Sequence, residues 1–131
     1  MWTSFTKNVD WLKNELEEFG TCKTHGKLPI VSRNIEIDKF LYEPEYNVLV
    51  ATPGAAKEGL TLTPANHVIF YDRSFSLDDY LQAQDRIHRI SQEKTCYIHN
   101  LIMTNSIDEW IDVLLNSKKL AAQLGQGDIS I

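Results

Sequence analysis

The sequence predicts an α/β fold in which a mainly parallel central sheet is covered by helices on both faces. Stretches with strand-like and helix-like patterns alternate along the 131 residues. The strand-like stretches at residues 47–52 and 67–71 are almost continuously apolar instead of alternating between apolar and polar. Strands buried on both faces have this composition, and they belong to sheets whose crossover helices cover both sides.

The first half of the chain predicts two short strands and two helices. Residues 1–3 are strand-like, and apolar residues at helical spacing from Val9 to Phe19 predict a helix that ends at Gly20. Residues 21–25 predict a second short strand. Residues 32–42 predict the second helix, which stops before Pro44 because a residue that precedes proline avoids the helical conformation.

The second half predicts three strands and two helices. A loop rich in glycine and threonine, residues 53–64, separates the strands at residues 47–52 and 67–71. Ser76, with Asp79 three residues later, predicts the start of a helix that runs to about Ile90. Residues 95–103 predict the last strand, and Ser106 with Glu109 predicts a capping box for the last helix.

The composition fits a soluble globular protein and excludes several classes. Hydrophobic residues make up 43% of the chain and charged residues 24%, which are ordinary values, and no apolar run is long enough to cross a bilayer. The N-terminus lacks the basic and apolar regions of a secretory signal. We therefore expect the cytoplasm, in a bacterial or phage-type context, or the nucleus. The isolated Cys22 and Cys96 have the spacing of neither a metal site nor a disulfide framework.

We expect residues 1–131 to form a single domain in which residues 125–131 are a frayed tail. A strand of residues 1–3 alone is short for a member of a sheet, so we expect a piece of a longer protein that is truncated within its first strand. The net charge of −5 argues against binding nucleic acid through bulk electrostatics. Any such contact must be local, or shared with another domain.

Residues 82–92, QAQDRIHRISQ, contain the first candidate site. On a helix with 100° per residue, Arg86 and Arg89 are surface neighbours, and Gln82 and Asp85 lie on the same side. Two adjacent guanidinium groups suit phosphate oxygens. The alternative is a solvated helix face with a salt bridge between Asp85 and an arginine. The opposite side of this helix is apolar and carries Tyr80, Ala83, Ile87 and Ile90.

The loop after residues 47–52 contains the second candidate site. Thr52 ends a buried strand, and the string GLTLT follows at residues 59–63. Ligands bind at the carboxyl ends of parallel strands, and backbone N–H groups with threonine hydroxyls can hold a phosphate without a net positive charge. Alternatively, Gly54 and Gly59 only permit turns, and the threonines cap helices.

Several other residues allow two interpretations. Ser4 and Phe5, at a strand-to-helix junction, are candidates for nucleic-acid contact, but Ser4 or Thr6 can instead cap the helix. Gly26 suits a close backbone approach, and His25 beside it is expected to be a surface or core histidine. Packing between helices and sheet, rather than stacking on bases, is expected of Trp2, Trp11 and Trp110.

The string Q-x-x-D-R-x-H-R-I-x-Q at residues 82–92 resembles motif VI of superfamily-two helicases, in the form typical of Snf-type (Swi/Snf) ATPases. The resemblance covers nearly the whole chain in the right order. Residues 2–12 resemble motif IV, residues 48–72 resemble motif V, and residues 95–111 resemble the strand and capped helix after motif VI. The chain is therefore similar to the second, C-terminal RecA-like domain of such an ATPase, which implies a RecA-like three-layer α/β/α fold.

This resemblance implies roles for the residues of the motif VI helix. Arg86 and Arg89 would reach a nucleotide held by a first, N-terminal RecA-like domain, with Arg89 as the principal arginine finger. Gln82 would couple the nucleotide to the domain interface, and Asp85 would orient the arginines. ATP and Mg²⁺ would be bound mainly by that first domain, because this sequence contains neither a P-loop nor an acidic metal-binding box. We therefore expect the chain alone to hydrolyse no ATP.

The resemblance also implies a DNA groove, and it favours double-stranded DNA and translocation without strand separation. The chain departs from the family at Ala56 and Lys57, where two glycines are usual, and Lys57 can instead contact a phosphate. A binding or regulatory module without motor activity remains the alternative, as does a doubly wound enzyme that binds a small phosphate ligand at residues 54–61. The expected nucleic-acid contacts are Ser4, Phe5, Gly26, Thr52, Lys57, Gly59 and Thr61.

Overall fold

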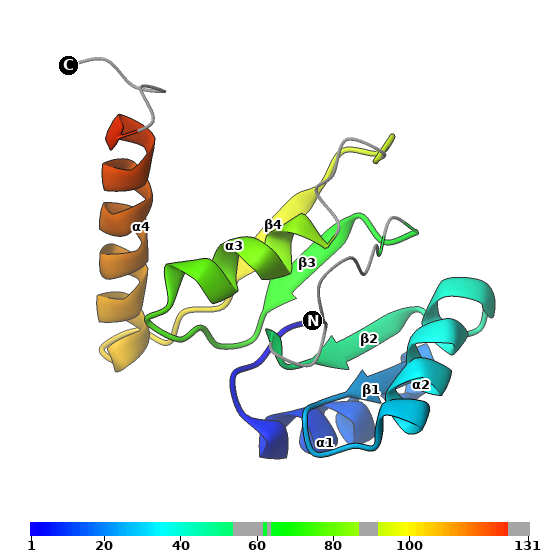
Figure 1. The fold of residues 1–131 in the computed structure, drawn as a ribbon. Coiled ribbons are helices and arrows are strands. Elements are labelled where there is room, and N and C mark those ends of the chain that lie inside the picture. Colours follow the sequence, from blue (N-terminus) through cyan, green and yellow to red (C-terminus); the bar gives the residue numbers. More distant parts are fainter. Residues whose placement is uncertain (54–61, 63, 87–91, 126–131) are drawn as a thin grey trace.

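The structure is a computed structural model, and it describes residues 1–53, 62, 64–86 and 92–125 (Figure 1). Helices and strands alternate along the chain, as predicted. In chain order the elements are α1 (Thr6–Glu15), the 3₁₀ helix η1 (Glu17–Phe19), β1 (Thr21–Thr24), α2 (Ile30–Tyr42), β2 (Val48–Ala51), β3 (His67–Phe70), α3 (Leu77–Asp85), β4 (Tyr97–Asn100) and α4 (Ile107–Gly125).

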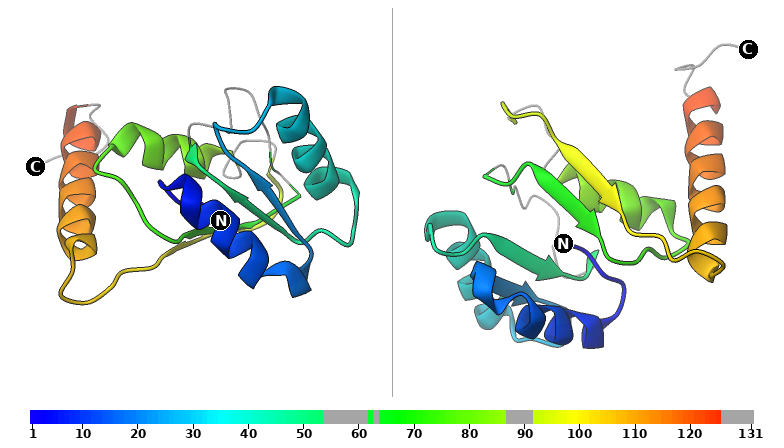
Figure 2. Two further views of the ribbon diagram at one scale, coloured as in Figure 1. Left: turned by 90° about the horizontal axis from the view of Figure 1, so that it is seen from below. Right: turned by 180° about the vertical axis from the view of Figure 1, so that it is seen from behind.

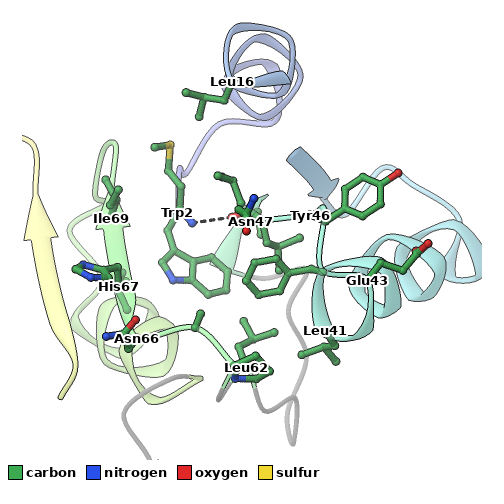
Figure 3. Close-up of a pocket in the computed structure, with 18 of the residues that line it drawn as sticks. Trp2, Leu16, Leu41, Glu43, Tyr46, Asn47, Leu62, Asn66, His67 and Ile69 are labelled. Carbon is green, nitrogen blue, oxygen red and sulfur yellow. Dashed lines mark hydrogen bonds between the residues drawn. The ribbon is translucent and has the colours of Figure 1, made fainter. Parts of the chain in front are cut away.

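The sheet is parallel, and the first residues of the chain lie at its centre. β1 pairs with β2, and β3 pairs with β4, both in parallel. Trp2 forms parallel bridges to Ala51 of β2 and to Phe70 of β3, so it lies between the two pairs (Figure 3). The order across the sheet is therefore β1, β2, residues 1–3, β3 and β4, and the strand predicted at residues 1–3 is reduced to these central bridges.

Helices cover both faces of the sheet, as predicted (Figure 2). On one face, Val9 and Leu12 of α1 pack against Val50 of β2. On the other face, Ala83 of α3 belongs to the main core cluster, and Phe40 of α2 packs against it. This arrangement is a three-layer α/β/α fold. The buried members of the main cluster are Trp2, Cys22, Leu49, Ala51, Leu62, Val68, Phe70 and Ala83.

The last helix, α4, stands beside α3 at the β4 side of the molecule (Figure 1). Its buried residues are Ile111 and Leu115, while Trp110 is 75% exposed. The prediction that Trp110 packs between helices and sheet is therefore wrong. Trp11 is also more than half exposed, with its ring 6.3 Å from that of Tyr71, whereas Trp2 is buried as predicted.

Gly20 ends the first helical segment, as predicted. Its φ of 73° lies in the left-handed region, which only glycine adopts without strain. A Cβ at this position would lie 1.9 Å from the carbonyl oxygen of Glu45. The turn between η1 and β1 therefore requires a glycine both for its backbone conformation and for the space around it.

The starts of α3 and α4 match the prediction in part. Ser76 caps α3, since its hydroxyl accepts the N–H of Asp79 at 3.2 Å. At α4, the Ser106 hydroxyl accepts the N–H of Asp108 at 3.1 Å. The carboxylate of Asp108 accepts the N–H of Met103, three residues before the cap, at 2.9 Å, and no bond from the Ser106 N–H to Glu109 is seen among the described residues.

Both cysteines are free thiols. Cys22 belongs to the main core cluster, and its burial raises the pKa of the thiol to about 11. It therefore acts as a small apolar side chain. Within the described part of the chain, no helix combines the length and the apolar character needed to cross a membrane.

Candidate functional site

Three connections leave the carboxyl edge of the sheet next to one another. Ser4 and Phe5 follow the central residues, Thr52 follows β2, and Gly26 lies shortly after β1. Because these strands are parallel neighbours, their carboxyl ends meet at one edge, with adjacent strands about 4.8 Å apart. The structure thus brings together four of the residues predicted to contact nucleic acid.

The accessibility of these four residues differs. Phe5 is 62% exposed, and Gly26 is exposed in a turn, while Ser4 and Thr52 are half-buried. A Cβ at Gly26 would meet no atom within 4 Å, so the described part of this chain makes no close approach there. The other three predicted contacts, Lys57, Gly59 and Thr61, lie outside the described residues and stay predictions.

Asp72, which was not among the predicted site residues, organises this edge. Its carboxylate accepts hydrogen bonds from the Thr3 hydroxyl, from the Ser4 N–H at 2.7 Å and from the Asn8 side chain at 3.2 Å. These bonds fix the turn from the central strand into α1. The N-cap position of α1 is Phe5, with no side-chain cap bond, so the interpretation that Ser4 or Thr6 caps this helix is wrong.

Arg73, the next residue, is also part of this edge and was also missed. It is buried, and its guanidinium donates to Asp112 of α4 at 2.6 Å. The same guanidinium lies 5.3 Å from the ring centroid of Tyr80. Arg73 therefore fixes α4 and α3 to the end of β3. The only signal in the sequence is that Asp72 and Arg73 directly follow a strand, where ligand-facing residues gather in parallel sheets.

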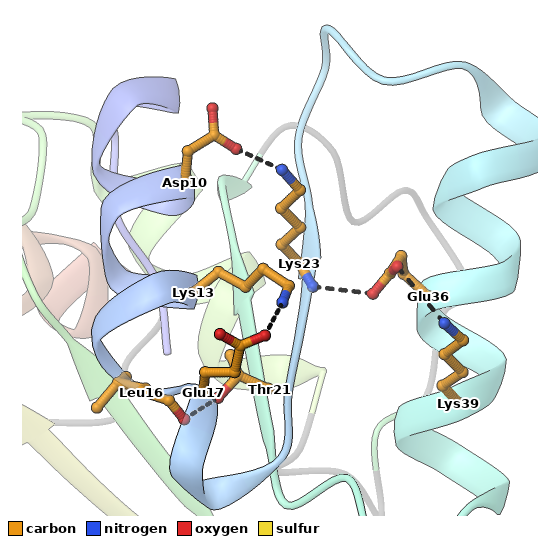
Figure 4. A network of polar contacts seen from close by, with 8 residues as sticks. All are labelled: Asp10, Lys13, Leu16, Glu17, Thr21, Lys23, Glu36 and Lys39. Carbon is orange, nitrogen blue, oxygen red and sulfur yellow. Dashed lines mark hydrogen bonds and ion pairs between the residues drawn. The ribbon is translucent and has the colours of Figure 1, made fainter.

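A network of charged residues fixes β1, which leads to Gly26, between α1 and α2 (Figure 4). Lys23 of β1 donates to Asp10 at 2.8 Å, and its backbone N–H donates to Glu36 at 3.2 Å. The hydrogen bond from Lys23 lowers the pKa of Asp10. His25 is buried, 3.5 Å from Asp10, and it accepts the Lys27 N–H at 3.2 Å. It is therefore a core histidine, one of the two predicted options.

The motif VI helix places its last residues at the opposite, amino edge of the sheet. α3 begins after β3 and runs back along it (Figure 1). Its final turn is tied to Leu62, which precedes β3, because the Leu62 N–H donates to the Arg86 carbonyl at 2.7 Å. Arg86 and the nucleic-acid candidates at the carboxyl edge therefore lie at different ends of the strands.

The predicted division of this helix into two sides holds for most of its described residues. Ala83 is buried, the ring of Tyr80 lies against that of Phe70, and Gln82 and Asp85 are exposed. Arg86 differs, since it is only 6% exposed. The solvated-face interpretation is therefore wrong for Arg86. Residues 87–91, which include Arg89, Ile87 and Ile90, lie outside the described residues.

The crossover between β2 and β3 connects the two edges. Because β2 and β3 are parallel, the chain after Thr52 must return to the amino edge before His67. Among the described residues, its end is hydrogen-bonded to the segments on both sides of residues 87–91. Besides the bond between Leu62 and Arg86, the Gln92 side chain donates to the Ala65 carbonyl at 2.9 Å, and the Asn66 side chain donates to the Thr95 carbonyl at 3.2 Å.

Comparisons with known proteins agree with this arrangement. The family model of the helicase conserved C-terminal domain matches residues 1–91. The ATP-dependent helicase fft1 of Schizosaccharomyces pombe is 33% identical over 120 residues, which cover 90% of this chain and 13% of fft1. The ATP-dependent helicase FUN30 of Saccharomyces cerevisiae is 34% identical over 116 residues, which cover 87% of this chain and 10% of FUN30. The chain thus spans about a tenth of the length of these relatives.

A solved structure shows the same fold. The crystal structure of the C-terminal part of the Fun30 ATPase domain superimposes with a TM-score of 0.79 at 33% sequence identity, covering 87% of this chain and 38% of that one. The chain therefore belongs to the helicase conserved C-terminal domain family, as the C-terminal RecA-like domain of a Snf-type helicase.

Proposed function

We propose that this chain is the second motor domain of an ATP-dependent, nucleic-acid-stimulated translocase, and that it hydrolyses no ATP alone. The observation that carries the proposal is the hydrogen bond between Leu62 and Arg86. It joins motif VI to the crossover that starts at Thr52 on the carboxyl edge. This contact between the end of the crossover and the end of α3 supports a coupling between nucleic acid at that edge and the arginines of motif VI.

The arginines act on an ATP site that a first, N-terminal RecA-like domain provides. Phosphoryl transfer gains most from cations placed on the γ-phosphoryl group in the transition state. The burial of Arg86 supports an assisting role, because its guanidinium is held within the chain. Arg89 is then the principal finger. Gln82 and Asp85, both exposed on α3, couple the nucleotide to the interface and orient the arginines.

ATP and Mg²⁺ belong mainly to the first RecA-like domain, which supplies the phosphate-binding loop and the acidic residues that this sequence lacks. The carboxyl edge of this chain holds double-stranded DNA through backbone N–H groups and hydroxyls. Support for this part comes from Ser4, Thr52 and Gly26, which follow neighbouring parallel strands. Neutral donors at one edge allow an acidic domain to contact phosphates.

The test is the substitution Arg89→Ala in a polypeptide that joins this chain to a first RecA-like domain. We expect DNA-stimulated ATP turnover to fall by on the order of 10³-fold, as for other arginine fingers. Affinity for double-stranded DNA should change little, since Arg89 acts on the nucleotide. Turnover is measured by phosphate release, and DNA affinity by fluorescence anisotropy.

Lys119→Ala is the matched control, because Lys119 is an exposed cation on α4, far along the chain from both motifs. It should leave turnover unchanged. If Arg89→Ala also leaves turnover unchanged, the chain is a binding or regulatory module and not part of a motor. DNA-stimulated hydrolysis by residues 1–131 alone would equally contradict the proposal.

A further inference from the structure

Tyr80, in the first half of α3, contacts two residues that are paired in the sheet. Phe70 of β3 and Asn100 of β4 are register partners, and paired residues on neighbouring strands point their side chains to the same face. The Tyr80 ring lies 4.7 Å from the ring of Phe70, measured between centroids. The Tyr80 hydroxyl lies 3.2 Å from Oδ1 and 3.1 Å from Nδ2 of Asn100, so it donates to the first or accepts from the second. One side chain thus joins α3 to two strands.

A third group, the guanidinium of Arg73, packs on the Tyr80 ring. Its central carbon lies 5.3 Å from the ring centroid. Arg73 also donates to Asp112 of α4 at 2.6 Å, and its side chain is only 4% exposed. Both interactions are stronger away from water, so they hold the ring firmly. We call the four residues Tyr80, Asn100, Arg73 and Asp112 the α3 anchor.

The α3 anchor lies before the residues of motif VI and therefore affects where they point. It holds the first half of α3, while the bond from Leu62 holds the other end to the crossover. Arg86 is six residues after Tyr80, which places it about 9 Å farther along the helix axis. A rotation of α3 by about 6° at the anchor would move Arg86 by about 1 Å, and a displacement of this size can lower a reaction rate by about 100-fold.

We propose that Tyr80 is a positioning residue for ATP hydrolysis, an inference that rests on the motor function proposed above. Its hydroxyl, through the bond to Asn100, sets the angle of α3 and with it the position of Gln82, Asp85 and Arg86 against the nucleotide. Tyr80 itself touches neither nucleotide nor DNA, because its ring and hydroxyl are directed at Phe70 and Asn100. Removing one polar partner leaves the other unsatisfied, whereas replacing both with apolar groups of similar shape is nearly neutral.

The test compares Tyr80→Phe, Asn100→Leu and the double substitution in the polypeptide that joins this chain to a first RecA-like domain. Each single substitution should lower kcat for DNA-stimulated ATP turnover by about 10-fold. The KM for ATP and the Kd for DNA should each stay within about twofold, because ground-state binding is kept. The double substitution should restore kcat to within about threefold of the unsubstituted protein, because no polar partner is then left unsatisfied.

Tyr42→Phe is the matched control, because Tyr42 is 77% exposed on α2. It removes the same hydroxyl and should leave kcat unchanged. A second measurement follows the helix without the chemistry. In residues 1–131, the NMR amide resonances of Gln82, Asp85 and Arg86 should shift in Tyr80→Phe and return toward their original positions in the double substitution.

The proposal is overturned if kcat is unchanged in Tyr80→Phe, even where Tm falls, since the hydroxyl then has only a structural role. It is also overturned if the resonances do not shift, or if kcat stays low in the double substitution, because the hydroxyl would then act other than by holding α3. If Arg89→Ala leaves turnover unchanged while the resonances shift in Tyr80→Phe, the anchor orients α3 but the motor function fails, and the role in hydrolysis fails with it.

Discussion

At the scale of single residues, the buried amino group of Met1 makes stability depend on pH. In the unfolded chain its pKa is near 8.0, and burial lowers the folded value to about 5. Between these values the unfolded state binds a proton that the folded state does not. Stability therefore rises with pH in this window, because the state that binds more protons is favoured when the pH falls.

We expect the free energy of unfolding to decrease as the pH falls from 8 toward 5. Each unit of pKa depression corresponds to about 1.4 kcal/mol, so the total is on the order of a few kcal/mol. Urea unfolding at a series of pH values measures it. Acetylation of the Met1 amino group removes the titrating group, and a pH dependence that survives acetylation unchanged would assign the effect elsewhere.

Residues at the candidate site were predictable where a local sequence motif marks them. They were not predictable where their role depends on a hydrogen-bond partner far away in the sequence. The position of Ser4, Thr52 and Gly26 at one edge of the sheet was predictable because each follows a strand. Asp72 was missed because its role depends on Thr3 and Ser4, 69 and 68 residues away. The burial of Arg86 was missed for a related reason, since a helical wheel gives the direction of a side chain but not what covers it.

At the scale of elements, the turn between η1 and β1 depends on the backbone conformation of Gly20. Gly20→Ala should lower the free energy of unfolding by about 2 kcal/mol or more. The φ of 73° is unfavourable for alanine, and the new Cβ would lie 1.9 Å from the Glu45 carbonyl oxygen. Chemical denaturation measures the change.

Gly26→Ala is the control for this substitution. The φ of Gly26 lies outside the left-handed region, and no described atom lies within 4 Å of its Cβ position. The free energy of unfolding of the Gly26→Ala chain should stay within about 0.5 kcal/mol of that of the unsubstituted chain. Equal effects of the two substitutions would show that the conformation of Gly20 is not the cause.

The helices and strands themselves followed from the sequence, because apolar periodicity and caps are local. Ser76 and Gly20 were found in this way. The position of α4 did not follow, since its apolar face predicts burial while Trp110 remains 75% exposed. A pattern shows that a helix has an apolar side, but it does not show how much of that side another element covers.

At the scale of the whole molecule, the net charge of −5 predicts that the affinity of this domain for DNA depends only weakly on salt concentration. Among the seven proposed contacts, Lys57 is the one cation, so this domain releases few counterions. In a motor protein that contains this domain, Lys57→Ala should reduce the slope of log K against log salt concentration by about 0.9. Thr61→Ala should weaken binding and leave that slope unchanged.

Fluorescence anisotropy titrations of double-stranded DNA at several salt concentrations measure both slopes. The contrast between the two substitutions is the informative result, since hydroxyl and backbone donors hold phosphates without displacing ions. A slope that falls equally for Thr61→Ala, or that does not fall for Lys57→Ala, would contradict the proposed set of contacts.

The class of fold was predictable because continuously apolar strands that alternate with helices have few arrangements. The order of strands was not. It depends on the bridges of Trp2 to Ala51 and to Phe70, which no local pattern reports. For the same reason, the sequence did not predict that Arg86 and Thr52 lie at opposite edges of the sheet, although it marked both residues as site candidates.

The central position of residues 1–3 has a consequence for the time course of folding. They meet partners 48 residues away at Leu49 and 69 residues away at Asp72. The pairs β1–β2 and β3–β4 can each assemble over shorter stretches of chain, but closing the sheet requires contacts of long sequence separation, which form slowly. We infer that the two halves meet late in folding and that the edges of β2 and β3 stay accessible to other chains until that step.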